Sequence, residues 1–158
     1  MKKAFEYNLN VTLNENFLNM PALHDFEVEK IEFKDNLLTI SSIDFKKHDY
    51  DYFDIVGFHP KKVIIEFISK ELLESNVTMS KYCPKKQIKE KEFDGFGKKS
   101  NCYDIEEFVK LSKKLKLEIL YNMVSYRQVN ILFASYNENV DEIEIAVYCD
   151  KVKYIFTN

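Results

Sequence analysis

The chain has 158 residues, a formal net charge of −3, and only three glycines and three prolines. Its 46% hydrophobic and 15% aromatic content excludes an intrinsically disordered chain and suits one β-rich domain over residues 1–158. Arg127 is the only arginine, and recognition of phosphate or guanine usually depends on arginine, so the composition argues against a nucleic-acid partner.

The first predicted elements are a strand and a hairpin. Residues 4–13 alternate apolar and polar side chains over five repeats, the period of a half-buried strand, and residues 14–24 predict a connection. Residues 23–43 predict an antiparallel hairpin that turns at Asp35-Asn36. The expected opposite pairs are Lys34 with Leu37, Phe33 with Leu38, Ile31 with Ile40, and Val28 with Ile43. The apolar pattern slips by one residue near Glu29-Lys30, which favours a β-bulge, although a strand buried on both faces at its start also fits.

Residues 44–83 predict further strands. The stretch 50–58 favours a short strand after a loop. Residues 62–69 favour a strand because β-branched and aromatic side chains alternate there, although Pro60 and the apolar spacing through residue 75 also fit a helix. Residues 77–83 have strand character as well.

Residues 84–101 differ in composition from the rest of the chain. They carry six lysines and two of the three glycines, and few apolar residues. We therefore expect an exposed lysine-rich loop. Acidic residues interrupt the lysines, which favours a solvated loop over a nucleic-acid contact.

The clearest helix signal covers residues 104–115. Asp104 as N-cap with Glu107 three residues later has the pattern of a capping box, and Tyr103 with Phe108 has the spacing of a hydrophobic staple. The apolar stripe of this segment predicts a helix that packs on the sheet.

The remainder predicts a meander of strands. The alternating apolar positions are Leu117, Ile119, Tyr121 and Met123, then Val129, Ile131 and Phe133, then Ile143, Ile145 and Val147. Asn137-Glu138-Asn139 predicts one turn and Asp150-Lys151 another, and folding at the second turn would oppose Val147 to Tyr154. The whole pattern predicts an α+β fold, mainly an antiparallel meander with one principal helix over 104–115.

The N-terminal residues, the lengths of the apolar stretches and the cysteines predict the cellular compartment. The N-terminal residues contain no apolar signal-peptide core, and no stretch approaches the length of about 18 apolar residues that spans a membrane. Cys83, Cys102 and Cys149 have no CxxC spacing, and an odd number of thiols fits a reducing compartment. We expect a soluble, cytoplasmic protein without a membrane partner.

Motifs that would carry catalysis are weak. His24-Asp25 and His48-Asp49 are HD dipeptides, but the HD metal phosphohydrolases carry such a dipeptide on helices, so turns are the favoured interpretation here. The sequence has no GxSxG nucleophile motif and no glycine-rich phosphate loop, and nothing around Cys83 or Cys102 supports a Cys-His pair. We predict no catalytic residues, no cofactor and no metal site.

Two acidic clusters are candidates for a protein interface. The first consists of Asp49, Asp51 and Asp54 with Tyr50, Tyr52 and Phe53, and the second of Asp141, Glu142 and Glu144. Tyrosines beside carboxylates are typical of interfaces in which aromatic rings anchor the partner and charge steers it. Such clusters also occur at exposed strand ends with no partner.

The chain resembles small bacterial immunity proteins of polymorphic-toxin and contact-dependent inhibition systems. The resemblance rests on Leu23-His24-Asp25 followed by the alternating residues of the hairpin through Ile40, and more loosely on Tyr103-Asp104 and the strand-rich C-terminal part. It implies an antitoxin-like protein that binds a cognate toxin domain, such as a nuclease, and occludes its active site. Asp49, Tyr50, Asp51, Tyr52 and Asp54 are the residues we expect at that interface. A small-ligand-binding β-rich domain is the alternative, and a hydrolase that uses His and Asp groups is a third hypothesis.

Overall fold

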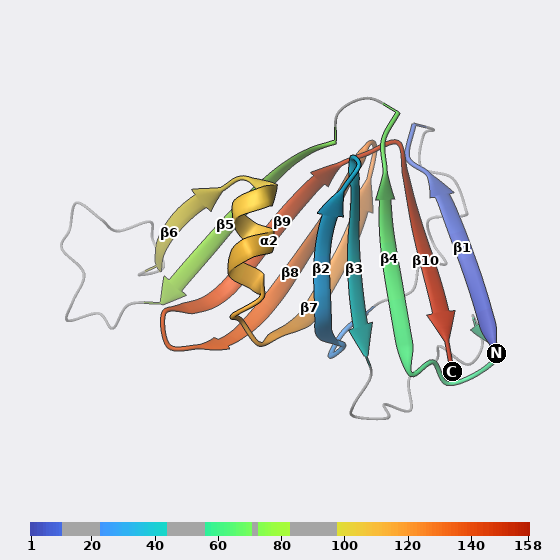
Figure 1. Ribbon diagram of the computed structural model, residues 1–158, viewed down its shortest axis with the longest axis horizontal. Coiled ribbons are helices and arrows are strands. Elements are labelled where there is room, and N and C mark those ends of the chain that lie inside the picture. The colour runs from blue at the N-terminus through green and yellow to red at the C-terminus, as the bar shows by residue number, and fades with distance from the viewer. Residues whose placement is uncertain (11–22, 44–55, 71–72, 83–97) are drawn as a thin grey trace.

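The polypeptide forms a strongly bent antiparallel sheet with a short helix against it (Figure 1). The computed structural model describes residues 1–10, 23–43, 56–70, 73–82 and 98–158. The strands are β1 (Lys2–Asn8), β2 (Glu27–Lys34), β3 (Leu37–Ile43), β4 (Lys62–Ile68), β5 (Glu74–Tyr82), β6 (Lys98–Tyr103), β7 (Leu117–Ser125), β8 (Gln128–Asn137), β9 (Val140–Tyr148) and β10 (Lys151–Thr157), and the helix is α2 (Ile105–Ser112). The predicted mainly antiparallel α+β fold is confirmed. No helix within the described ranges is long and apolar enough to cross a membrane.

The sheet divides into two halves at the contact between β2 and β7. Its strand order is β1-β10-β4-β3-β2-β7-β8-β9-β5-β6, but β2 pairs with β7 only through Glu27 and Glu118. We call β1-β10-β4-β3-β2 the first half and β7-β8-β9-β5-β6 the second half. The halves face each other, since Asn122 of β7 donates a hydrogen bond of 3.2 Å to the hydroxyl of Tyr154 in β10. Figure 1 accordingly shows β7 and β8 passing behind β2 and β3.

The core lies between the two halves. Alternate residues of each strand point inward, as the period of two in a strand requires, and they form one continuous cluster of buried side chains. Tyr7 and Tyr154 meet edge to face in the first half, with ring centroids 5.9 Å apart. Phe108 of α2 lies 6.4 Å from Phe133 of β8, so the helix closes one end of the same core.

The hairpin of β2 and β3 matches the sequence prediction at its turn. Asp35 and Asn36 both have positive φ, 51° and 62°, as a two-residue type I′ turn requires. The pairs nearest the turn are confirmed, and so is the bulge, which lies between Val28 and Lys30. The predicted pairing of Val28 with Ile43 is wrong, because the extra residue of the bulge shifts the register and places Val28 opposite Ser42.

Several other strands begin or end at residues different from those predicted. The strand predicted over 62–69 is confirmed as β4, and the strand predicted over 77–83 is β5, which begins earlier at Glu74. Of the strand predicted over 50–58, only residues 56–58 are described, and they are not strand. Of the strand predicted over 4–13, β1 covers residues through Asn8 and residues 11–13 lie outside the described ranges.

The helix begins as predicted and ends early. The carboxylate of Asp104 accepts a hydrogen bond of 2.7 Å from the N–H of Glu107. α2 ends at Ser112 instead of residue 115, because the N–H groups of Lys114 and Leu115 turn to the carbonyls three residues earlier, which tightens the chain before β7.

The lysine-rich loop predicted over 84–101 is wrong at its end. Residues 98–101 belong to β6, which pairs with β5, and residues 84–97 lie outside the described part of the chain. Ser80 and Ser100 face each other across these strands with hydroxyl oxygens 3.0 Å apart.

The predicted C-terminal hairpin is wrong. β10 does not pair with β9 but lies between β1 and β4 in the other half of the sheet. Asp150 redirects the chain, because its carboxylate accepts hydrogen bonds of 2.7 Å from the side chain of Asn10 and from the N–H of Lys70. β10 has a hydrogen-bonded neighbour along its whole length on each edge, from Lys151 to Thr157.

Asn36 provides a test of the hairpin turn. It holds a left-handed conformation, and its side chain accepts a hydrogen bond of 2.7 Å from the N–H of Leu73. Asn36→Gly keeps the left-handed backbone accessible and removes the hydrogen bond to Leu73, and it should lower the free energy of unfolding by about 1 kcal/mol in a urea titration. Asn36→Ala adds the left-handed strain and should cost about 2 to 3 kcal/mol in total. Equal losses for the two variants would contradict the turn assignment.

Candidate partner-binding face

The first predicted interface segment cannot be placed. Asp49, Tyr50, Asp51, Tyr52 and Asp54 all lie outside the described residues. Their role at an interface therefore stays a prediction.

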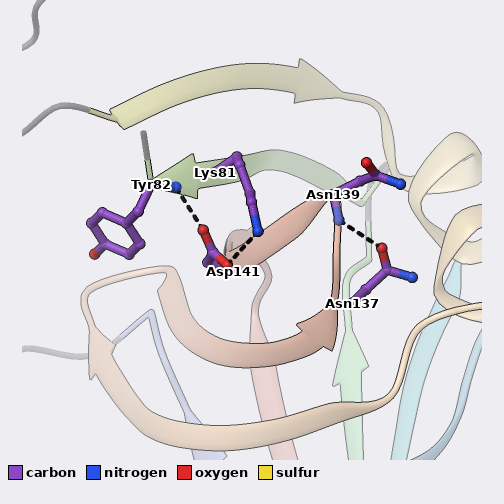
Figure 2. A network of polar contacts seen from close by, with 5 residues as sticks. All are labelled: Lys81, Tyr82, Asn137, Asn139 and Asp141. Carbon is purple, nitrogen blue, oxygen red and sulfur yellow. Dashed lines mark hydrogen bonds and ion pairs between the residues drawn. The ribbon is translucent and has the colours of Figure 1, made fainter. Parts of the chain in front are cut away.

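In the second acidic cluster, Asp141 holds strands together. Figure 2 shows its carboxylate between β9 and β5, where it accepts hydrogen bonds of 2.8 Å from Lys81 Nζ and 2.6 Å from the N–H of Tyr82. The hydrogen bond from Lys81 holds the pKa of Asp141 below its ordinary value. Beside it, the side chain of Asn137 accepts a hydrogen bond of 3.0 Å from the N–H of Asn139 and shapes the β8–β9 turn.

Glu142 and Glu144 point to the other face of β9, and they differ in their contacts and exposure. Glu142 accepts a hydrogen bond of 3.1 Å from Lys98 Nζ, and its hydrogen bond with Tyr82 raises the pKa of that phenol. Glu144 is exposed in the middle of the strand. The predicted cluster is thus separated into two residues that hold β5 and β6 to β9 and one that faces solvent.

The outer face of the first half carries several ion pairs. Lys62 lies 2.6 Å from Glu29, Lys151 lies 2.6 Å from Glu6, and Lys153 lies 3.4 Å from Glu66. Lys30 and Glu32 are 2.7 Å apart on the same sheet. Paired charges of this kind are typical of exposed positions on a sheet, and they lie on the same face as Ile155 of β10, which is buried.

The outer face of the second half has a different composition. Cross-strand register places three rows of side chains on it: Tyr121, Leu132 and Glu144; Met123, Asn130 and Ala146; and Ser125, Gln128 and Tyr148. We call these nine residues the Tyr-Met face. Tyr121 is 43% exposed, Met123 58% and Tyr148 38%, so three large side chains lie exposed on one face.

A β-bulge explains why Tyr121 and Met123 are outside. The sequence pattern puts them on the same face as Leu117 and Ile119, but the register of β7 shifts between Ile119 and Tyr121. One extra residue moves every later side chain to the opposite face. Asn122 therefore points inward, where its amide accepts a hydrogen bond of 3.0 Å from the N–H of Leu23 and donates one to Tyr154.

The Tyr-Met face is typical of a protein-binding surface. Interface centres are enriched in tyrosine and methionine and depleted in lysine, and the nine residues contain no lysine or arginine. Glu144 gives this face a negative charge, and Glu74 lies opposite Tyr148 on β5. Sequence reasoning missed this face, although the outward set of β9, namely Glu144, Ala146 and Tyr148, was readable from strand alternation.

The histidines and cysteines do not assemble a catalytic site in the described residues. His24 Nδ1 lies 2.8 Å from the carboxylate of Asp25, and both residues form a turn, as the favoured interpretation of this dipeptide expected. The described ranges contain no group of three or more His, Cys, Asp or Glu side chains that could hold a metal ion. Burial raises the pKa of the Cys149 thiol to about 12, so this thiol is protonated and a poor nucleophile at neutral pH.

A groove of about 670 Å³ lies between α2 and β2. It is open to solvent and lined partly by exposed charged residues such as Glu32, Lys34 and Lys113. A small-ligand site would be a closed, mostly apolar cavity, and this groove does not have that character.

Asp141→Asn tests the structural role of the half-buried carboxylate that pairs with Lys81 and Tyr82. Because the pKa of Asp141 is lowered, its ionised form stabilises the fold above the ordinary pKa of 3.8, and this contribution is lost as pH falls through the folded-state pKa. Urea denaturation should show the variant less stable than wild type at pH 7, with the difference shrinking toward pH 3. Glu144→Gln, the exposed control, should change little at either pH. A pH-independent deficit in Asp141→Asn would contradict the assignment.

Comparison with known proteins found no family model, no curated protein and no solved structure that matches this chain.

Proposed function

We propose that this protein is an immunity protein, which uses the Tyr-Met face to bind a cognate toxin domain in the cytoplasm and to occlude its active site. The observation that carries the proposal is the contrast between the two outer faces of the sheet. One face neutralises its charges with ion pairs, and the other exposes Tyr121, Met123 and Tyr148 around a carboxylate. Exposed aromatic side chains that are not required for the core favour a binding role.

The breadth of the Tyr-Met face favours a protein partner over a small molecule. Its residues lie on three adjacent strands, so they form a broad surface and not a concave pocket. Tyrosine gives large contact area and a polar hydroxyl at a low cost in conformational entropy. These features support a macromolecular partner.

The charge of the face supports a basic partner. Glu144 lies within it, Glu74 lies opposite Tyr148 on β5, and the chain carries a net charge of −3. Many toxins of the systems that the chain resembles act as nucleases, and an enzyme that binds nucleic acid has a basic substrate groove. An acidic, tyrosine-rich surface would complement such a groove and exclude its substrate.

The segment from Asp49 to Asp54 enters the proposal as a second contact. Like the Tyr-Met face, it combines tyrosines with carboxylates. Charge reversal of Asp49, Asp51 and Asp54 together should weaken toxin binding, and unchanged affinity would remove this segment from the interface without affecting the role of the Tyr-Met face.

The central test is to identify the partner and then remove the anchors. The partner is captured by co-purification from the native cell with identification by mass spectrometry, and its gene is expected next to the gene for this chain. Tyr121→Ala with Met123→Ala should weaken the complex by at least tenfold, since truncation of an interface anchor costs about 2 kcal/mol or more. The same double variant should fail to protect cells that express the toxin domain.

The matched control lies on the other outer face. Leu37 and Thr39 lie on the outer face of β3 in the first half, so Leu37→Ala with Thr39→Ala should leave toxin binding and protection unchanged. Thermal melts of both double variants would show that each remains folded. Equal affinity of the two folded variants for the toxin domain would contradict the proposed interface.

A further inference from the structure

The outer edge of β2 is open along most of its length. β2 pairs with β3 from Glu27 to Lys34, but its other side pairs with β7 only at Glu27. From Val28 to Lys34, none of the strands described here lies beside that edge. An open edge presents backbone N–H and C=O groups to whatever lies next to it.

The turn geometry identifies which backbone groups point outward. A two-residue type I′ turn is closed by a hydrogen-bonded pair, here Lys34 with Leu37, and hydrogen-bonded pairs then alternate along an antiparallel ladder. Lys34 and Glu32 therefore direct their backbone groups to β3. Ile31 and Phe33 direct their N–H and C=O groups away from β3, toward the open edge.

The space beside this edge is the groove between β2 and α2. Its lining residues are Val28, Glu29, Lys30, Ile31, Glu32, Phe33, Lys34, Val109, Ser112, Lys113, Leu115 and Leu117. β7 would occupy this space if it began earlier, but the chain before Leu117 turns away into α2. The groove thus has the position of a missing strand, with apolar side chains of Val109 and Leu115 on its helix side.

The charges in the groove favour an acidic occupant. Glu29 lies 2.6 Å from Lys62, and Glu32 lies 2.7 Å from Lys30, so each of these carboxylates has a lysine beside it. The lining carries three lysines, Lys30, Lys34 and Lys113, against the two glutamates, and Lys34 Nζ lies 3.9 Å from Asp35 in an exposed pair. The charged side chains along β2 also disfavour indiscriminate pairing with flat, uncharged strands, so the edge selects its partner by charge.

We propose that this groove is a second binding site, which takes an extended acidic segment of a partner protein as an added strand on β2. Backbone groups of the segment would bond to those of Ile31 and Phe33, and its alternate apolar side chains would contact Val109 and Leu115. Six residues of strand span about 20 Å, which matches the open length of β2. This inference does not depend on the proposed immunity function.

A designed peptide tests the site in the intact chain. The probe is an acetylated, amidated peptide of seven residues, with valine at alternate positions and glutamate or threonine between them. Titrated into the isotopically labelled protein, it should shift the amide proton signals of Ile31 and Phe33 downfield and slow their exchange with solvent. The same peptide with an N-methyl group on every residue should not bind, because neither of its edges can then donate a backbone hydrogen bond to β2.

Two tryptophan variants provide the control. Ser112→Trp fills the groove, whereas Leu111→Trp adds the same side chain at an exposed helix position that does not line it. We expect Ser112→Trp to abolish peptide binding and Leu111→Trp to retain it, with thermal melts showing that both variants fold. Absence of peptide binding to wild type, shifts confined to the edges at β1 or β6, or equal binding by the two variants would each overturn the proposal.

Discussion

The single residue pair between β2 and β7 is the constraint on which the rest of the structure depends. Glu27 and Glu118 are the only paired positions there, supported by a hydrogen bond of 2.8 Å from the N–H of Asp25 to the carbonyl of Ile119. With so little pairing, the sheet bends sharply, and its two halves bury their inner faces against each other. The same short joint leaves the rest of β2 without a neighbouring strand and creates the groove beside α2.

Two bulges decide which side chains reach solvent. Because side chains alternate along a strand, one extra residue reverses the direction of every residue that follows it. In β2 the bulge near Glu29 keeps Phe26 and Ile31 on the core side, and both are buried. In β7 the bulge has the opposite effect, since it turns Tyr121 and Met123 out of the core and brings in the polar Asn122. A surface with the composition of an interface arises from that reversal.

Local signals in the sequence predicted local structure well. The hairpin turn at Asp35-Asn36 and the N-cap at Asp104 depend on residues within a few positions of each other, and both are confirmed. The placement of β10 could not be predicted in this way, because it depends on contacts of Asp150 with Asn10 and Lys70, which are distant in the sequence. Nearest-neighbour pairing of Val147 with Tyr154 fitted the pattern equally well and is wrong.

The candidate interface shows the same limit of prediction from local sequence. Composition could identify tyrosines and carboxylates as interface residues, but it could not show that Asp141 and Glu142 are engaged by Lys81 and Lys98. It also could not show that Tyr121 is exposed, because a strict alternation from Ile119 would bury it. Only the register across three strands brings the aromatic residues together on one face.

The central claim is that the Tyr-Met face contacts the partner. The most direct measurement is hydrogen–deuterium exchange of this protein alone and in complex with the toxin domain captured from the native cell. We predict slower exchange in the peptides that contain Tyr121, Met123 and Tyr148, and unchanged exchange in β3, β4 and β10. Protection confined to those three strands of the first half, with unchanged exchange in β7 and β9, would contradict the claim.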